Sequence, residues 1–308
     1  MRLTALVLPL AACGVALAAC GSDSSSTSGG GGAASSTSAT GSGSTSAVAA
    51  STCATGSLTI SGSTALQPLA QKAATAYMAK CSGSTITVSG GGSSTGLANA
   101  ANGQSDIGMS DVPVSNAKSI DASTVTDHQV AIAVFAVIAN PKTNVTSLTT
   151  QQIQDLFSGK VTNWKDVGGA DVPVTLIERK AGSGTRVAFD KDIMGSVAEA
   201  ANPASTQDST SLVLQGVQGA DGGVSYLSAA SASGVTVLSI GSVKPTADTV
   251  AGGTYPFFAH EHMYTKGACS AIAQDFINYM LGAAFQAQAA SAGFLPVATT
   301  STQSASDK

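Results

Sequence analysis

The stretch that decides the fold runs from Ser57 to Gly96 and reads SLTISGSTALQPLAQKAATAYMAKCSGSTITVSGGGSSTG. It begins with a short apolar strand at 58–60 and continues through small residues into a helix over 66–80. A second strand is predicted at 85–88, and it ends in a glycine-rich turn. Strand, helix and strand in this order predict an α/β fold with mixed, mostly parallel sheets.

The same alternation of strands and helices continues along the chain. The apolar run Val130 to Ala139 ends at Asn140-Pro141, so we expect a buried strand that leaves a first lobe. TYPFFAHEHMYT, from Thr254 to Thr265, predicts a strand that returns to that lobe, and 272–290 predicts a helix that completes it. Between the two crossings we predict helices at 149–157, 185–194 and 211–218, and strands at 172–177, 222–228 and 235–240. Two crossings predict a two-lobed clamshell with a ligand cleft between the lobes.

Composition limits the function classes. The chain has 308 residues, which suits about two domains, and it is 43% hydrophobic but only 10% charged. Its net charge of -4 and the lack of any Lys/Arg run argue against a nucleic-acid partner. An anionic ligand would therefore have to be held by local dipoles.

The N-terminus is typical of a bacterial lipoprotein signal. Met1-Arg2 is positive, residues 3–19 are apolar, and Leu17-Ala18-Ala19 leads into Cys20, the predicted lipidation site. Cys13 follows the same small residues, but more apolar residues come after it. The alternative is an uncleaved membrane helix, for which about 17 apolar residues broken by Pro9 are marginal.

These patterns divide the chain into five parts. We predict a signal peptide at 1–19, a Gly/Ser-rich flexible tether at 20–52 and a polar tail at 299–308. Lobe I is predicted to comprise 53–135 plus 251–298, and lobe II 136–250. The expected location is the outer face of the cell membrane, with contact to the membrane through the lipid anchor only.

Three cysteines remain beyond the lipidation site, in an oxidising compartment. A βα unit returns the end of its helix to the start of its strand, so we expect a disulfide between Cys53 and Cys81. Cys269 is predicted to be a buried thiol within an amphipathic helix.

Three loops of small residues, at 61–65, 90–96 and 182–185, each connect a predicted strand to a predicted helix. Glycine lets the backbone approach a ligand, and a helix start offers free N–H donors at the positive end of its dipole. Each loop alone is explained by helix capping. Three together, with Arg179 beside the last, favour an oxyanion ligand. None of the loops matches a Walker or a G-x-G-x-x-G nucleotide loop.

Five motifs carry a family resemblance along most of the chain, from Ser57 to Phe294. They are ISGSTALQPLA, GGGSSTGL, SDIGMSD, FSGKVTNWKDVGG and RKAGSGTR. Their order and spacing resemble the phosphate-binding proteins of bacterial phosphate ABC transporters. The resemblance implies a periplasmic-binding-protein-like, type II fold.

The resemblance also implies a set of phosphate-binding residues. They are Ser63, Thr64, Ala65 (through its N–H), Ser93, Asp111, Arg179, Ser183, Gly184 and Thr185. Arg186 fits the same pattern, and its contact is open between the site and the neighbouring lobe. Relatives often carry an acidic residue one or two positions after the arginine, where this chain has Lys180 and Ala181. What orients Arg179 is therefore open.

Asp111 predicts which anion is chosen. Near neutral pH phosphate still carries a proton, whereas sulfate does not, and a carboxylate can only accept a hydrogen bond. Asp111 would therefore favour phosphate and repel sulfate. The alternative is that Asp111 caps a turn before Val112-Pro113. Its neighbour Asp106 is expected to brace a strand.

The resemblance implies capture of inorganic phosphate, as hydrogen phosphate or dihydrogen phosphate, by a monomer. The partners it implies are ABC permease subunits with a cytoplasmic ATPase, with no cofactor, no metal and no catalysis. A phosphatase or serine hydrolase is disfavoured because it would need an activated nucleophile with a base, or metal ligands, and the sequence shows no metal-binding cluster. A phosphate sensor, an adhesin or a binder of another oxyanion remain alternatives.

Several other side chains are expected to be structural. His260 and His262 share one face of a predicted strand, where packing is favoured over a metal pair. Trp164 is expected to anchor a turn, and Tyr226 and Tyr255 to lie in the core or hinge. His128 is expected to be structural as well.

Overall fold

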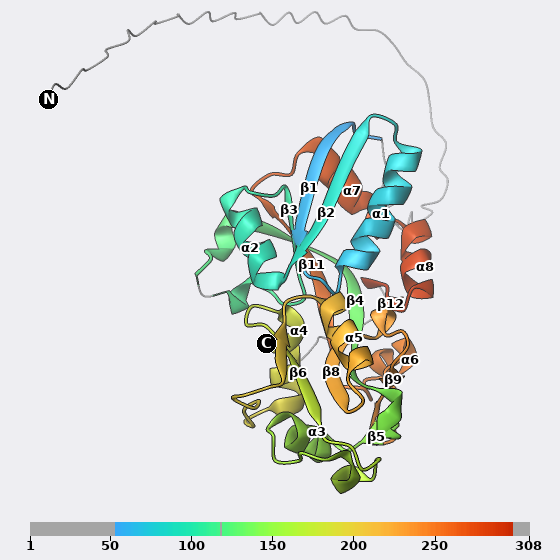
Figure 1. The fold of residues 1–308 in the computed structure, drawn as a ribbon. Helices are drawn as coiled ribbons and strands as arrows, with labels where there is room; N and C mark the ends of the chain where they lie inside the picture. The colour runs from blue at the N-terminus through green and yellow to red at the C-terminus, as the bar shows by residue number, and fades with distance from the viewer. Residues whose placement is uncertain (1–52, 118, 298–308) are drawn as a thin grey trace, which may run out of the picture. The chain divides into compact units, whose positions relative to one another are not determined.

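The computed structural model describes residues 53–117 and 119–297, which belong to one compact unit, Ala47–Lys308 (Figure 1). The predicted signal peptide, the Cys20 lipidation site, the tether and the polar tail lie outside the described residues. In the described part of the chain, no helix has the length and apolar character needed to cross a membrane.

The centre of the fold is one mixed β-sheet. Its strands lie in the order β2 (Ser84–Gly91), β1 (Gly56–Gly62), β3 (Ile107–Ser110), β11 (Phe258–Lys266), β4 (Val125–Ala139), β8 (Gly223–Ser228), β6 (Thr175–Arg179) and β7 (Ser205–Gln207). Two short strands, β9 (Thr236–Val237) and β12 (Phe294–Leu295), also pair with β4. A separate two-stranded sheet joins β5 (Ser147–Leu148) to β10 (Ser239–Ile240).

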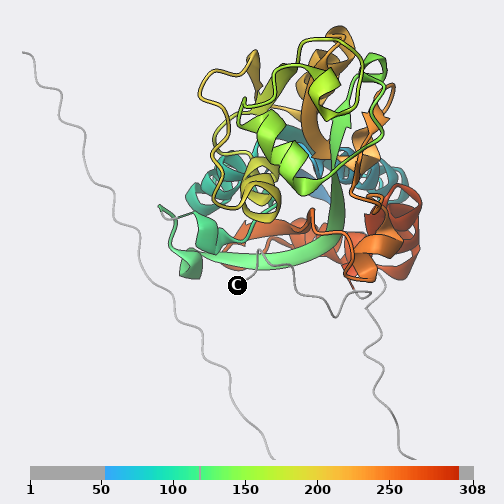
Figure 2. The ribbon, with the colours of Figure 1, turned by 90° about the horizontal axis from the view of Figure 1, so that it is seen from below.

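Strand β4 joins two halves of this sheet. Its residues 125–134 pair with β11, and its residues 135–139 pair with β8. We call β2, β1, β3, β11 and the start of β4 the first half-sheet, and the end of β4 with β8, β6 and β7 the second half-sheet. Figure 2 shows the long green strand β4 bending as it passes between them. The outer strands pair in parallel, but β4 and β11 pair antiparallel because the chain leaves and returns through adjacent strands.

Helices cover both half-sheets (Figure 1). Those by the first half-sheet are α1 (Gln67–Lys80), α2 (Ser93–Asn102), α7 (Ala271–Leu281) and α8 (Ala283–Ser291). Those in the other half are α3 (Thr150–Phe157), α4 (Gly184–Phe189), α5 (Thr210–Gly219) and α6 (Ala247–Ala251). The start predicted for α3 is confirmed, since Thr149 and Gln152 form a capping box there.

Two of the predicted helices are wrong in extent. The helix predicted over 272–290 is two helices, because Gly282 has extended backbone angles and ends α7. The helix predicted over 185–194 is α-helical only to Phe189, and residues 190–194 continue as a π-helical turn. Helix α2 starts at Ser93, within the small-residue loop predicted at 90–96, after Gly92 takes up a φ of 85°.

Glycine brings α2 onto the sheet, which places its N-terminus beside the end of β1. A Cβ on Gly62 would lie 2.2 Å from the carbonyl oxygen of Met109, and one on Gly96 would lie 2.3 Å from the same oxygen. Neither position has room for a side chain, and Gly62 also has a φ of 135°. This close packing fixes the first residues of α2 relative to β1 and β3.

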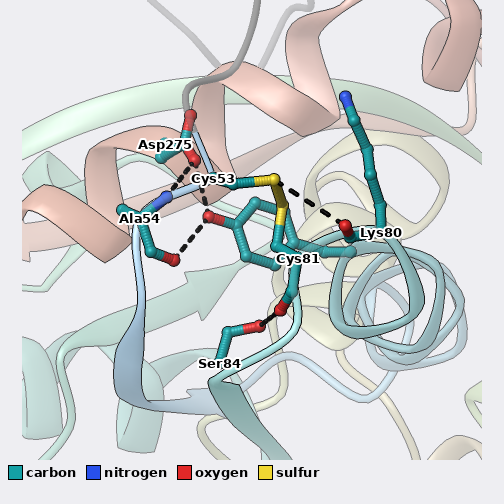
Figure 3. The surroundings of a disulfide bond; sticks show 7 residues. Cys53, Ala54, Lys80, Cys81, Ser84 and Asp275 are labelled. Atoms are coloured by element: carbon teal, nitrogen blue, oxygen red, sulfur yellow. Dashed lines mark hydrogen bonds between the residues drawn. A yellow bond between two sulfur atoms is a disulfide. The ribbon is translucent and has the colours of Figure 1, made fainter.

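The predicted disulfide between Cys53 and Cys81 is confirmed, and Figure 3 shows its surroundings. Beside it, the Asp275 carboxylate accepts hydrogen bonds from the Ala54 N–H at 2.9 Å and from the Tyr77 hydroxyl at 2.6 Å. The prediction for Cys269 is wrong. Cys269 precedes α7, whose N-cap is Ser270, and it is partly exposed as a free thiol. Its sulfur lies 3.2 Å from Thr265 Oγ1.

Replacing Cys53 and Cys81 together with serine is expected to lower the free energy of unfolding by about 3 kcal/mol. The bond closes a loop with a sequence separation of 28, so it restricts the unfolded chain more than the folded one. Urea unfolding of the double variant and the parent measures this cost. Equal midpoints would show that the hydrogen bonds of Asp275 hold the segment without the disulfide.

Candidate anion-binding site

The three small-residue loops meet at one place, between the two half-sheets. The loop after β1 carries Ser63 and Thr64, and the start of α2 carries Ser93. The start of α4 carries Ser183, Gly184 and Thr185. Parallel strands place their carboxyl ends at one edge of a sheet, so the loops that follow them converge there. All nine residues implied by the family resemblance lie in this region, and each is buried.

Asp111 is the buried carboxylate at the centre of the site, with 2% of its surface exposed. Its Oδ1 accepts a hydrogen bond from Ser63 Oγ, and its Oδ2 accepts one from Thr185 Oγ1 at 2.7 Å. Its own N–H donates to Ser93 Oγ at 3.0 Å. The side chain therefore points into the site with both oxygens facing hydroxyl groups, which is not the arrangement of a simple turn cap.

Arg179, at the end of β6, is the buried cation of the site, with 1% of its surface exposed. Its Nη2 donates to Thr64 Oγ1 at 3.0 Å, but its Nε and Nη1 have no acceptor among the described residues. Burial lowers the pKa of the guanidinium, and negative charge, led by that of Asp111, opposes the shift. A buried cation with unpaired donors is costly in a folded protein. The geometry therefore offers two guanidinium donors to an anion.

Several direct hydrogen bonds cross at this place from the half with the first half-sheet to the half with the second. Arg179 reaches Thr64, Thr185 reaches Asp111, and the N–H of Ser94 donates to the carbonyl of Gly182 at 3.1 Å. Helix α4 also lies close to α2 here. A Cβ on Gly184 would lie 2.4 Å from Ser93 Oγ, so only glycine allows this approach.

Two hydroxyls of these loops also accept hydrogen bonds from nearby backbone N–H groups. Ser63 Oγ accepts from the N–H groups of Ala65 and Leu66, both at 3.1 Å. Ser183 Oγ accepts from the N–H of Arg186 at 3.3 Å and caps α4. The loop hydroxyls therefore bond to the backbone in this structure, and they are the same atoms that the family resemblance implies as ligands of the anion. The Ala65 N–H, which the resemblance makes a ligand, donates to Ser63 here.

Sequence reasoning missed Asp208, which bears on what orients Arg179. Asp208 directly follows β7, the strand beside β6, and its negative charge acts on the Arg179 guanidinium. It also lines a cavity of about 250 Å³, together with Thr64 and Lys180. The available signal was the position of Asp208 in the fold. Strand β7 pairs in parallel with β6, so the residue that follows β7 lies at the same sheet edge as Arg179 at the end of β6.

Thr210, at the start of α5, is a second missed residue. Its hydroxyl lies 3.1 Å from Thr64 Oγ1, and its N–H donates to the same oxygen at 3.2 Å. With the guanidinium of Arg179, three groups therefore surround Thr64 Oγ1. A Ser-Thr pair at a helix start, in 209–210, was the available signal.

Arg186 holds the backbone of Arg179 rather than reaching Asp111. Its Nη1 donates to the Arg179 carbonyl, and its Nη2 pairs with Glu199 and lies 3.6 Å from Glu178. All of these partners belong to the half that carries α4. These contacts match neither of the two that the sequence left open: Arg186 holds the main chain of Arg179 within its own half.

The titration of the buried Glu199 carboxyl should make the free energy of unfolding depend on pH. Burial raises its pKa to about 7, against the attraction of Arg186 and the hydrogen bond from Tyr226. Between pH 4.5 and 7 the folded protein keeps this proton while the unfolded chain releases it, so stability is lost as the pH rises through that range. The loss is at most on the order of 3 kcal/mol.

Thermal unfolding of Glu199→Gln measures this loss. The variant is expected to lose less stability than the parent between pH 4.5 and 7, because the amide does not titrate. Asp192, whose pKa burial also raises to about 7, titrates in both proteins and cancels in the comparison. Parallel curves for parent and variant would contradict the assignment.

The other polar candidates have structural partners. His262 Nδ1 lies 2.9 Å from Asp127, and His128 Nε2 lies 3.3 Å from Thr265 Oγ1. The indole of Trp164 is fully buried and donates to the Gly222 carbonyl at 2.9 Å. Within the described residues, His, Cys, Asp and Glu form no group of three suited to a metal ion.

Two further expectations are confirmed. Asp106 braces β1 by accepting hydrogen bonds from the N–H and the hydroxyl of Thr59, both at 2.7 Å. Tyr226 and Tyr255 lie in the core, with 0% and 1% of their surfaces exposed.

Comparisons with known proteins agree with this chemistry. Residues 47–284 match the family model of the PBP superfamily domain. The phosphate-binding protein PstS of Bacillus subtilis is 39% identical over 249 residues, which is 79% of this chain and 82% of that protein. A crystal structure of a putative phosphate ABC transporter substrate-binding protein with bound phosphate, from Clostridium perfringens, has a TM-score of 0.74 and 28% identity. That alignment covers 79% of this chain and all of the other.

An ABC-type phosphate transport receptor from Vibrio cholerae is also similar, with a TM-score of 0.62 and 25% identity over 77% of this chain and 99% of that one. The family model covers more than half of the chain, and the relative from B. subtilis covers most of both proteins. The predicted periplasmic-binding-protein-like fold is therefore confirmed. The chain belongs to the PstS family of phosphate-binding proteins, within the PBP superfamily.

Proposed function

We propose that the protein captures inorganic phosphate at the site around Asp111 and Arg179 and delivers it to an ABC permease for import. The observation that carries the proposal is the pair of buried groups itself. Arg179 offers two unpaired guanidinium donors, and Asp111 lies opposite as an acceptor. An anion that also carries a proton satisfies both groups at once.

The proposed ligands are the nine residues that the family resemblance implies. Arg179 supplies the positive charge, while the starts of α2 and α4 supply N–H and hydroxyl donors from Ser93 and from residues 183–185. Asp111 accepts the proton that distinguishes phosphate from sulfate. The relative with bound phosphate from C. perfringens supports this choice of ligand.

Release is proposed to occur by opening between two lobes, 53–135 plus 251–298 and 136–250. These bounds place the first half-sheet in lobe I and the second half-sheet in lobe II, and the chain crosses between them in β4 and again just before β11. Bound phosphate would stabilise the closed form only by its greater affinity for that form. The permease, with its ATPase, is proposed to open the lobes.

The remaining parts of the proposal concern the cell. We propose a monomer attached to the outer face of the membrane through lipid on Cys20, with the Gly/Ser-rich segment 20–52 as a tether. Relatives named as phosphate-binding and substrate-binding proteins support a binding role without catalysis.

Uptake of labelled phosphate by cells that lack the gene tests the transport role. The account predicts loss of high-affinity uptake, restored by the intact gene but not by a gene carrying Arg179→Met. Normal uptake in the deletion strain, with a defect only in signalling or attachment, would favour the sensor or adhesin instead. Release of phosphate from a phosphoester by the purified protein would favour an enzyme.

A further inference from the structure

Glu261 is a carboxyl group buried completely behind the anion site, with 0% of its surface exposed. It lies in β11, where His262 pairs with Ser110 of β3 in antiparallel register. Glu261 comes directly before His262, and Asp111 comes directly after Ser110. Continuing the register by one residue therefore sets Glu261 opposite Asp111. Residues opposite one another in such a pair present their side chains on the same face. The fold thus places two carboxyl groups side by side.

The two groups cannot both be ionised and still hydrogen-bond. The carboxyl of Glu261 is completely buried, and the negative charge of Asp111 acts on it. No donor among the described residues reaches either Glu261 oxygen. Since a carboxylate can only accept, a hydrogen bond between the two groups requires that one of them carries a proton.

The surroundings decide which group carries it. Asp111 accepts hydrogen bonds from Ser63 and Thr185 and attracts the Arg179 guanidinium. Glu261 has no such support. Burial, followed by the charge of Asp111, raises the pKa of Glu261 well above its ordinary value. The proton of the pair therefore lies on Glu261.

We propose that Glu261 is a positioning residue of the phosphate site, whose neutral carboxylic acid donates a hydrogen bond to the Asp111 carboxylate. This inference rests on the proposed phosphate-binding function. The hydrogen bond holds Asp111 in one orientation and stabilises its ionised, accepting form. The neutral state of Glu261 also keeps a second negative charge away from an anionic ligand.

Few other charged groups bear on this pair. On β11 itself, His260 and His262 point to the opposite face of the sheet, where His262 meets Asp127. From the packed elements, α2 presents Ser93 and α4 presents Thr185, neither of which titrates near neutral pH. Asp111 itself belongs to the segment after β3, and its cationic neighbour is Arg179.

Two substitutions of Glu261 in the full chain separate the effect of its hydrogen-bond donor from the effect of its ability to ionise. Glu261→Gln keeps an N–H donor but cannot ionise, and Glu261→Met has similar length but no donor. In titration calorimetry with inorganic phosphate, Glu261→Gln is expected to bind within about threefold of the parent. Glu261→Met is expected to bind about 10- to 100-fold more weakly, because a hydrogen bond to a charged group is lost.

The pH profile separates positioning from packing. The parent is expected to lose phosphate affinity at alkaline pH as Glu261 ionises, whereas Glu261→Gln keeps its affinity. Asp275→Asn is the matched control, since Asp275 is a buried carboxylate of the same half that contacts Ala54 and Tyr77 instead. It is expected to leave phosphate affinity unchanged.

Several results would overturn the inference. Tighter phosphate binding by Glu261→Gln would mean that Glu261 is ionised in the parent, and equal affinities of Glu261→Met and the parent would mean that the donor is unnecessary. Equal losses in both variants would indicate packing alone. Infrared spectra test the proton without phosphate: the parent should show a protonated-carboxyl band at neutral pH that Glu261→Gln lacks. Failure of the parent to bind phosphate would instead reject the proposed function.

Discussion

Replacing Arg179 with methionine is expected to weaken phosphate binding by about 10³-fold while leaving the folded protein as stable as the parent or more stable. The guanidinium is 1% exposed, and two of its donor groups have no acceptor among the described residues. Removing it takes away a desolvated cation, whose burial destabilises the fold, and the positive charge proposed to face the anion. Calorimetry and urea unfolding on one sample measure both effects.

The opposite directions of the two effects make this experiment specific. Lys165→Met is the control, because Lys165 is an exposed cation paired with Asp171 at 3.1 Å, and its loss should alter neither quantity measurably. If Arg179→Met unfolded more easily and also lost phosphate, the arginine would be a structural residue. If it bound phosphate normally, Arg179 would not be a ligand.

Replacing Asp111 with asparagine is expected to reduce the preference for phosphate over sulfate from roughly 10⁴-fold to about tenfold. Ser63 and Thr185 donate to the two Asp111 oxygens, so the carboxylate is fixed as an acceptor. Asparagine adds an N–H₂ donor that a sulfate oxygen can accept, and it removes the charge that repels sulfate. Affinities for both anions, measured at one pH, give the ratio.

Asp106→Asn tests whether any nearby carboxylate has this effect. Asp106 hydrogen-bonds to Thr59 and lies outside the proposed ligand set, so the ratio should remain that of the parent. An unchanged ratio in Asp111→Asn would remove the carboxylate from the explanation of specificity. The selectivity would then have to come from the donors alone.

The parts of the site that the sequence predicted are those that follow local rules. Residues 61–65, 90–96 and 182–185 each pair a strand end with a helix start, and parallel strands bring such junctions to one edge. The disulfide follows from the geometry of a single βα unit. The apolar run in β4 and the strand-like pattern that continues into β11 are local signals, which is why these two strands could be predicted.

The missed residues depend on pairings between distant segments. Glu261 meets Asp111 only because β11 pairs antiparallel with β3, a register that no local pattern specifies. Asp208 approaches Arg179 because β7 pairs with β6. The break at Gly282 and the position of Cys269 before α7 depend on backbone angles and on a cap at Ser270. Such features arise from tertiary packing, which overrides helical pattern and propensity.

A buried acceptor and a buried donor set together are proposed to select a protonated anion, and a comparison of phosphate with sulfate tests this selection. Titration calorimetry of the purified protein with phosphate and with sulfate, across neutral and mildly alkaline pH, compares two tetrahedral anions that differ in a proton. The account predicts that phosphate binds far more tightly than sulfate throughout the range in which it keeps that proton. Equal affinities for the two anions would contradict the account.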